Sequence, residues 1–174
     1  MSEHRYDIRP RRESDLPQLE ALADAVRLTD VYPADDPDFF LSPLVLSAWV
    51  ALDSGGDVVG HAALHSASAA EMMAMAAQAA GRPVHELAAV SRMLVRKDAR
   101  RQGVGRRLLA TAVDDAHARG LWPVLDTGAM FDAAIAMYES FGFTRVGPVS
   151  FPYRHGDEIL MTDSVVYIGP PPAL

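Results

Sequence analysis

The chain has 174 residues, of which 49% are hydrophobic and 22% charged, and it carries a formal net charge of −7 without any cysteine. This length and hydrophobic content suit one folded domain, which can bury enough apolar surface to offset the entropy lost on folding. The lack of cysteine excludes disulfides, thiolate metal sites and a cysteine nucleophile, and the acidic balance argues against broad binding to nucleic acid.

The N-terminal residues 1–15 carry charges throughout and contain no apolar stretch of the kind that a secretory signal needs. We therefore expect a cytoplasmic protein. The longest weakly polar stretch, residues 62–80, is rich in alanine and methionine but is interrupted by His65, Glu71 and Gln78. A membrane-spanning helix needs about 20 predominantly apolar residues. We expect no membrane span, and instead a helix over the core within this stretch.

The first half of the chain predicts strands and one amphipathic helix. Residues 6–9 alternate like a short strand, and Ser14 then stands at the position of a helix N-cap, before apolar residues at helical spacing. Residues 28–43 contain three prolines and four aspartates, which predicts a loop. Residues 49–52 and 58–64 are apolar runs on either side of a turn sequence, as in an antiparallel hairpin.

The second half alternates strands with helices. Residues 87–95 form an apolar run with β-propensity, and the clearest helix begins near Val104 and is expected to end at Gly120. The elements predicted after it are a strand at 121–126, a helix at 132–141 closed by Gly142, and strands at 143–149 and 159–168. Hairpins combined with helical crossovers predict a mixed α/β fold in a single domain over residues 1–174, with a loose tail at 169–174.

One stretch of this acidic chain is strongly basic. Six of the sixteen lysine and arginine residues lie between residues 96 and 107, opposed there only by Asp98. The stretch includes a glycine-bearing turn between the strand and the clearest helix, made of Arg100, Arg101, Gln102, Gly103, Val104, Gly105 and Arg106. A helix N-terminus exposes unpaired backbone N–H groups, and glycine lets an anion approach them closely. The turn predicts a pyrophosphate site, and the alternative is a tight turn with a solvated basic face.

The pattern Arg-x-x-Gly-x-Gly between a strand and an amphipathic helix resembles the acyl-CoA motif of the GNAT superfamily of N-acyltransferases. Residues 6–10 resemble that family's first strand, residues 58–62 its third strand, and residues 138–143 its late helix-to-strand turn. The resemblance implies a mostly antiparallel sheet of six to seven strands with a splayed central strand and about four helices. It also implies an N-acetyltransferase that moves an acetyl group from acetyl-CoA to a primary amine by direct attack in a ternary complex.

The resemblance further implies which residues hold acetyl-CoA. Backbone groups of Met93, Leu94 and Val95 would bind the pantetheine arm, and backbone amides of the glycine-bearing turn would take the pyrophosphate. A backbone N–H near Met93 or Leu94 would stabilise the oxyanion. Three positions depart from the family pattern, because Lys97 replaces a proline, Arg101 replaces a glycine, and Phe131 replaces an asparagine that precedes the late helix.

Acyl transfer to an amine needs a base for the amine and an acid for the departing thiolate. Tyr138 stands four residues before Gly142, in the place of the family's tyrosine acid, and the alternative is a core aromatic. Glu86, just before the central strand, is the first candidate for the base, with an ordinary surface glutamate as the alternative. Four further residues could reach a cleft, although each has a commoner structural role, namely His61, His65, Ser91 and Asp126.

The acceptor and the assembly are not specified by the sequence. A small-molecule amine and a protein N-terminus both remain open, and nothing decides between a monomer and a homodimer. No histidine pair has helical metal spacing, so we expect no metal. Two rival functions are a catalytically degenerate acyl-CoA sensor, which would not need Tyr138, and a nucleic-acid module, which the net charge of −7 disfavours.

Overall fold

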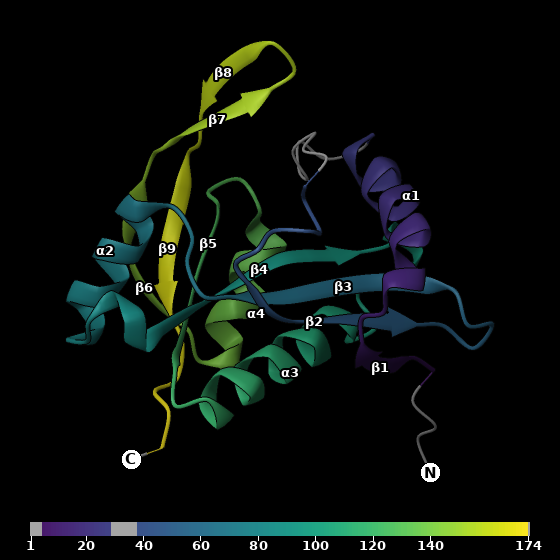
Figure 1. The fold of residues 1–174 in the computed structure, drawn as a ribbon, viewed down its shortest axis with the longest axis horizontal. Coiled ribbons are helices and arrows are strands. Elements are labelled where there is room, and N and C mark those ends of the chain that lie inside the picture. Colours follow the sequence, from purple (N-terminus) through teal and green to yellow (C-terminus); the bar gives the residue numbers. More distant parts are fainter. Residues whose placement is uncertain (1–4, 29–37, 174) are drawn as a thin grey trace.

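The computed structural model describes residues 5–28 and 38–173, and a seven-stranded sheet forms its centre (Figure 1). The sheet order is β1-β2-β3-β4-β5-β9-β6, and every neighbouring pair is antiparallel except β4 and β5. The strands are β1 (Asp7–Pro10), β2 (Val45–Leu52), β3 (Val58–His65), β4 (Leu87–Val95), β5 (Trp122–Gly128), β6 (Thr144–Val149) and β9 (Ser164–Ile168). The mixed, mostly antiparallel sheet predicted from the sequence is confirmed.

Four α-helices cover the two faces of this sheet in the described residues (Figure 1). They are α1 (Leu16–Arg27), α2 (Ala70–Ala80), α3 (Val104–Ala118) and α4 (Asp132–Phe141). The apolar side of α1 packs on β2, β3 and β4, and that of α2 on β4, β5 and β9, so these two helices share one face. The other face is covered by α3 and α4. None of the described helices is both long and apolar enough to cross a membrane.

The centre of the sheet opens into a V. The parallel pair of β4 and β5 is limited to three residues on each strand, Leu87–Ala89 and Trp122–Val124. Beyond that point β4 pairs only with β3, and β5 pairs only with β9. The splayed central strand implied by the sequence is therefore present.

A β-bulge lies in β4 where the V opens. His61 pairs with Leu94 and Ala63 with Ser91, so three steps on β4 match two steps on β3. The extra residue is Arg92, whose backbone is left-handed with φ of 56°. A bulge reverses the alternation of side chains beyond it, which places Leu94 on the same face as Ala89. Counting alternate residues along the strand from Glu86 therefore does not show which face of the sheet Glu86 shares with residues beyond the bulge.

The start of α1 differs from the prediction. Ser14 is wrong as the N-cap, because residues Glu13–Asp15 form a 3-10 turn and Asp15 directly precedes the helix. The Asp15 carboxylate accepts hydrogen bonds from the Arg9 guanidinium at 2.7 Å and from the Arg12 backbone N–H at 2.7 Å. Of the predicted loop at 28–43, residues 29–37 lie outside the described residues.

The C-terminal strands also differ from the prediction. The single strand expected at 159–168 is two strands, β8 (Glu158–Met161) and β9, because Thr162 closes a local loop by hydrogen bonds with Phe151. β8 pairs with β7 (Pro152–His155) in a hairpin that projects from the main sheet (Figure 1). In the predicted loose tail, the Gly169 N–H donates to the Pro123 carbonyl at 2.8 Å.

A glycine in β3 allows α3 to lie close to the sheet. A Cβ at Gly60 would lie 3.0 Å from Leu108 Cδ1 and 3.2 Å from Val104 Cγ1, both on α3. It would also lie 3.2 Å from the Leu94 carbonyl oxygen, so it cannot turn away from the helix. We predict that Gly60→Ala lowers the free energy of unfolding by about 1–3 kcal/mol, because the helix must shift from the sheet.

Gly147→Ala provides the matched control for this prediction, which urea unfolding checks. A Cβ at Gly147 would meet only Met75 Cε among the described atoms, at an ordinary contact distance of 3.5 Å. The unfolding midpoint of this variant should stay near that of the wild type. Equal midpoints for the two variants would show that α3 does not depend on the missing side chain of Gly60.

Candidate active site

The turn before α3 presents a row of free backbone N–H groups. Arg101 and Gly103 both have left-handed backbones, with φ of 60° and 82°, and α3 begins at Val104 without a side-chain cap. The Arg107 N–H donates to the Gly103 carbonyl at 3.0 Å. In the described part of the chain, the amides of residues 101–106 donate to no protein acceptor. Such an array, at the positive end of a helix dipole, binds anions.

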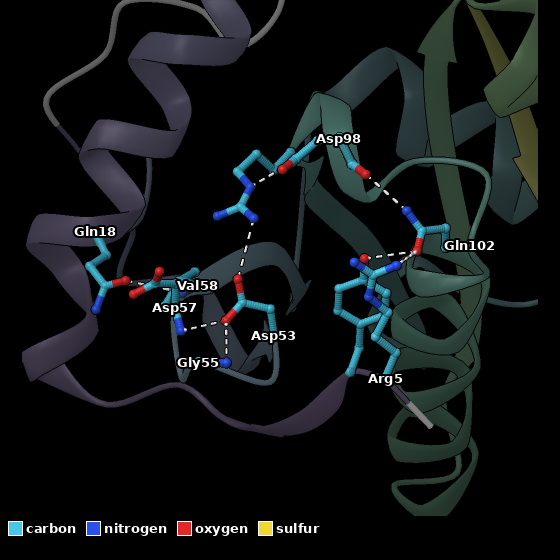
Figure 2. Close-up of polar contacts among 10 residues, drawn as sticks. Arg5, Gln18, Asp53, Gly55, Asp57, Val58, Asp98 and Gln102 are labelled. Atoms are coloured by element: carbon cyan, nitrogen blue, oxygen red, sulfur yellow. Dashed lines mark hydrogen bonds and ion pairs between the residues drawn. The ribbon is translucent and has the colours of Figure 1, made fainter. Parts of the chain in front are cut away.

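Side chains from two distant segments brace this turn (Figure 2). Arg96 donates to Asp98 at 2.6 Å and to Asp53, in the turn between β2 and β3, at 3.3 Å. The Gln102 amide donates to the Asp98 carbonyl at 2.8 Å, and its oxygen accepts from the Tyr6 hydroxyl at 3.0 Å. The hydrogen bond from Arg96 lowers the pKa of Asp98. The brace is therefore fully charged at neutral pH and holds the free amides in place.

Most of the basic side chains between residues 96 and 107 are engaged by protein acceptors. Besides Arg96, the engaged side chains donate to the Val95 carbonyl (Arg100), the Ser140 hydroxyl (Arg106) and the Tyr6 carbonyl (Arg107). Within the described residues, Lys97 and Arg101 have neither a hydrogen bond nor an ion pair from their side chains. The turn therefore combines unpartnered backbone N–H groups with two positively charged side chains that are unpaired among the described residues.

One edge of β4 faces the V with unpaired backbone groups. The Arg96 N–H donates to the Val59 carbonyl at 2.7 Å, across an antiparallel pair. Backbone groups alternate between the two edges of a strand, so the N–H groups of Val95 and Met93 point away from β3 and toward the gap. Leu94 is paired with β3 instead. At this edge the N–H groups of Met93 and Val95 have no partner strand among the described residues.

A buried histidine marks the other side of the V, on the face covered by α1 and α2. His61 is fully buried, and its ring lies edge-on to Phe40 at 4.9 Å between centroids. Arg11 donates to His61 Nε2 at 3.0 Å, and His61 Nδ1 lies 2.8 Å from the Arg92 carbonyl. Because a guanidinium only donates, the ring carries its proton on Nδ1 and is neutral. Burial lowers the pKa of His61 to about 3.

Two polar atoms next to this histidine are buried without a partner. They are His65 Nε2 and Arg92 Nε. Burial, with the positive charges of Arg92 and Arg11, lowers the pKa of His65 to about 4. The Arg92 guanidinium lies 4.5 Å from the centroid of the Phe39 ring. Neither of its terminal nitrogens has a hydrogen bond or an ion pair within the described residues.

An aspartate on β5 completes the group. Asp126 shares a face of the sheet with Val124, which packs beneath α2. Burial raises the pKa of Asp126, while the Ser164 hydroxyl and the charge of Arg92 act in the opposite direction. We call His61, His65, Arg92 and Asp126 the acceptor-side cluster. It joins β3, β4 and β5 around the opening of the V.

The two predicted catalytic residues lie apart from this cluster. Glu86 forms an ion pair with Arg82 at 2.8 Å in the turn before β4, and six residue steps of about 3.3 Å each along the strand lead from it to Arg92. Tyr138 lies on the opposite face, 6% exposed, with its ring 6.0 Å from Phe143. The structure does not bring Glu86 and Tyr138 together.

Sequence reasoning named three members of the acceptor-side cluster but missed Arg92. The available signal was an arginine in the middle of the apolar run of residues 87–95. A charged residue inside a buried strand is rare unless it is paired or functional. Among the residues that the structure describes, no three histidine, aspartate or glutamate side chains converge as metal ligands would.

The model of the Acetyltransferase (GNAT) family matches residues 14–143 of the chain. The fold is similar to that of the ribosomal-protein-S18-alanine N-acetyltransferase from Escherichia coli, with a TM-score of 0.70 and 22% identity over 97% of this chain and 96% of that chain. A GNAT-family acetyltransferase from Staphylococcus aureus has a TM-score of 0.68 and 18% identity, over 94% and 98% of the two chains. A GCN5-related N-acetyltransferase from Kribbella flavida has a TM-score of 0.63 and 21% identity, over 93% and 96%. No curated protein sequence matches the chain.

The two buried histidines make stability dependent on pH. Their folded-state pKa values, about 3 for His61 and about 4 for His65, lie below the ordinary value of 6.5. Below pH 6.5 the unfolded chain therefore binds protons that the folded chain does not bind, and the free energy of unfolding falls as the pH drops. Each such proton contributes about 1.4 kcal/mol per pH unit. We predict that the two histidines contribute about two protons to the slope of the free energy of unfolding between about pH 6 and pH 4.5, and that the raised pKa of Asp126 acts against this slope.

Urea unfolding across this pH range measures the slope. His65→Asn should reduce the slope by about one proton, because the variant lacks one of the two side chains that take up a proton only in the unfolded chain. His85→Asn, which replaces an exposed histidine, is the control and should keep the slope of the wild type. A slope that His65→Asn leaves unchanged would mean that His65 is protonated in the folded protein.

Proposed function

The chain belongs to the GNAT acetyltransferase family, and from this premise we propose that it transfers an acetyl group from acetyl-CoA to a primary amine. The observation that carries the proposal is the row of partnerless amides at residues 101–106, which ends at the opening of the V. A pyrophosphate fits such a row, because several N–H groups converge without a competing protein acceptor. Lys97 and Arg101 supply free positive charge beside it.

The edge of β4 supports the same proposal. A pantetheine arm carries amide groups that pair with a strand edge, and Met93 and Val95 offer their N–H groups toward the gap. An arm that follows this edge from the phosphate turn brings the thioester to the place where β4 and β5 part. The thioester then lies between the face of α3 and α4 and the acceptor-side cluster.

We assign the two proton transfers to residues on either side of the V. The amine nitrogen attacks the thioester carbonyl carbon, the carbon–sulfur bond breaks, and the acetyl group is left on the amine. Tyr138 gives its phenolic proton to the departing sulfur, and Asp126 takes the proton that the amine loses. Asp126 is preferred to Glu86 as the base, because it lies at the V while Glu86 is ion-paired with Arg82 outside it.

A second candidate is an acyl-CoA-binding sensor without catalysis. It is favoured by the position of Tyr138, which is 6% exposed among aromatic rings in the core. A sensor needs the free amides and the strand edge but no acid and no base. The two candidates therefore differ in turnover and not in binding.

The role of Tyr138 is tested by release of free thiol from acetyl-CoA over a panel of primary amines. We predict that acetyl-CoA raises the melting temperature of the wild type and of Tyr138→Phe alike, because the hydroxyl does not take part in binding. Turnover of Tyr138→Phe should fall by about 100-fold, since a general acid contributes about that much. Equal turnover on a good acceptor would contradict the assignment. Binding without any turnover would favour the sensor.

The role of Asp126 is tested by the pH dependence of kcat/KM. Because burial raises the pKa of Asp126, its carboxylate becomes able to accept a proton only at a pH above the ordinary range of an aspartate. We predict that kcat/KM rises with pH as Asp126 loses its proton. Asp126→Asn should lower kcat/KM by about 100-fold and remove this rise. If Glu86→Gln has this effect and Asp126→Asn does not, the base is Glu86.

A further inference from the structure

We propose that the acceptor is an amine with a carboxylate next to its amino group, as in an amino acid, and that Arg92 binds this carboxylate. The inference rests on the proposed function and names the substrate class of the same site. It excludes a peptide N-terminus as a good acceptor, because an amide stands there in place of the neighbouring carboxylate.

Arg92 is held in position by its backbone. It is the bulged residue of β4, and its φ of 56° is a left-handed conformation that is unfavourable for a residue with a Cβ. The His61 ring lies 2.8 Å from the Arg92 carbonyl and braces this conformation. The bulge brings the side chain over Phe39, on the face of α1 and α2. A strained and braced arginine at the opening of the V indicates a functional site.

Arg92 has no counter-ion in the described part of the chain. Its Nε is buried without a partner, and its terminal nitrogens make no hydrogen bond or ion pair. Arg92 as a whole is half-buried, but a buried N–H of a cation that has no partner is costly. The neighbouring His61 and His65 are neutral at pH 7, and Arg11 adds a second positive charge. An anionic ligand supplies the negative charge that the described residues do not place on Arg92.

The shape of the site favours a carboxylate as that anion. The Arg92 Cζ lies 4.5 Å from the centroid of the Phe39 ring, and none of the guanidinium nitrogens has a hydrogen-bond partner among the described residues. A carboxylate in the same plane accepts two parallel N–H hydrogen bonds from such a fork. The buried His65 Nε2 lies within electrostatic reach of Arg92 and lacks a partner of its own.

The relation between Arg92 and Asp126 indicates where the amine lies. Asp126 lies on β5 where β4 and β5 have parted, and the charge of Arg92 opposes the rise in its pKa that burial causes, so the two groups are within electrostatic reach. They form no ion pair within 4 Å among the described residues. Opposite charges that share a partly buried site without contact leave room for a ligand with both charges. An amino acid fits this arrangement, with its carboxylate on Arg92 and its amino group toward Asp126, the proposed base.

Matched acceptors test the proposal. Thiol release from acetyl-CoA is followed with free amino acids, with the corresponding amino acid amides, and with a peptide. We expect kcat/KM to be about 10- to 100-fold higher for the free amino acids, as the loss of a charged hydrogen bond implies. Arg92→Gln should remove this preference through KM, and Arg92→Lys should restore part of it. Arg119→Gln is the control, because Arg119 pairs with Asp115 at the far end of α3, and it should keep the preference.

The outcomes separate the proposal from the function on which it rests. If amides and peptides are acetylated as well as free amino acids, or if Arg92→Gln keeps the preference, the carboxylate site is wrong while the acetyltransferase stands. If no amine is acetylated, the proposed function fails. Binding of free amino acids then tests the carboxylate site by itself. Free amino acids that raise the melting temperature of the wild type but not of Arg92→Gln would still support the site, and no shift in either would overturn it. An acetyl-CoA-dependent rise in the melting temperature of Arg92→Gln shows that the variant is folded.

Discussion

The early parting of β4 and β5 is the constraint on which the other features depend. Two parallel strands that separate after three paired residues leave the edge of β4 without a partner strand. Buried backbone groups without hydrogen bonds are costly, so the gap is stable only if something else pairs with them. The free edge, the free amides at the start of α3 and the acceptor-side cluster all meet at this gap. In the proposed function, the gap separates the acetyl-CoA side from the amine side.

The basic side chains of this acidic protein differ in whether they have protein partners. Its net charge is −7, and most arginines of the basic stretch are used to hold elements together. Arg106 links the first turn of α3 to α4, and Arg96 links the segment before the glycine-bearing turn to the turn between β2 and β3. Among the described residues, the cations without protein partners include Lys97 and Arg101 beside the free amides, and Arg92 in the acceptor-side cluster.

The acceptor-side cluster also sets a cost for the fold. His61 and His65 are buried in neutral form, and Arg92 is held in a left-handed backbone conformation and has no counter-ion within the residues that the structure describes. Each of these features lowers stability relative to an apolar side chain at the same place. The surrounding core offsets the cost, since α1, Phe39 and Phe40 cover this side of the sheet. Such local cost is typical of sites that bind a charged ligand.

The sequence by itself determined the elements whose signals are local. The strand at 87–95 and the helix at 132–141 were predicted with the bounds that the structure shows, because periodicity and a closing glycine such as Gly142 act within a few residues. Only the tertiary structure decided that Arg92, His65 and Asp126 lie within electrostatic reach of one another, and that Glu86 pairs with Arg82. These residues lie on different strands, and one bulge changes which side chains share a face. Sheet register and bulges arise from pairing between distant segments, which no local pattern encodes.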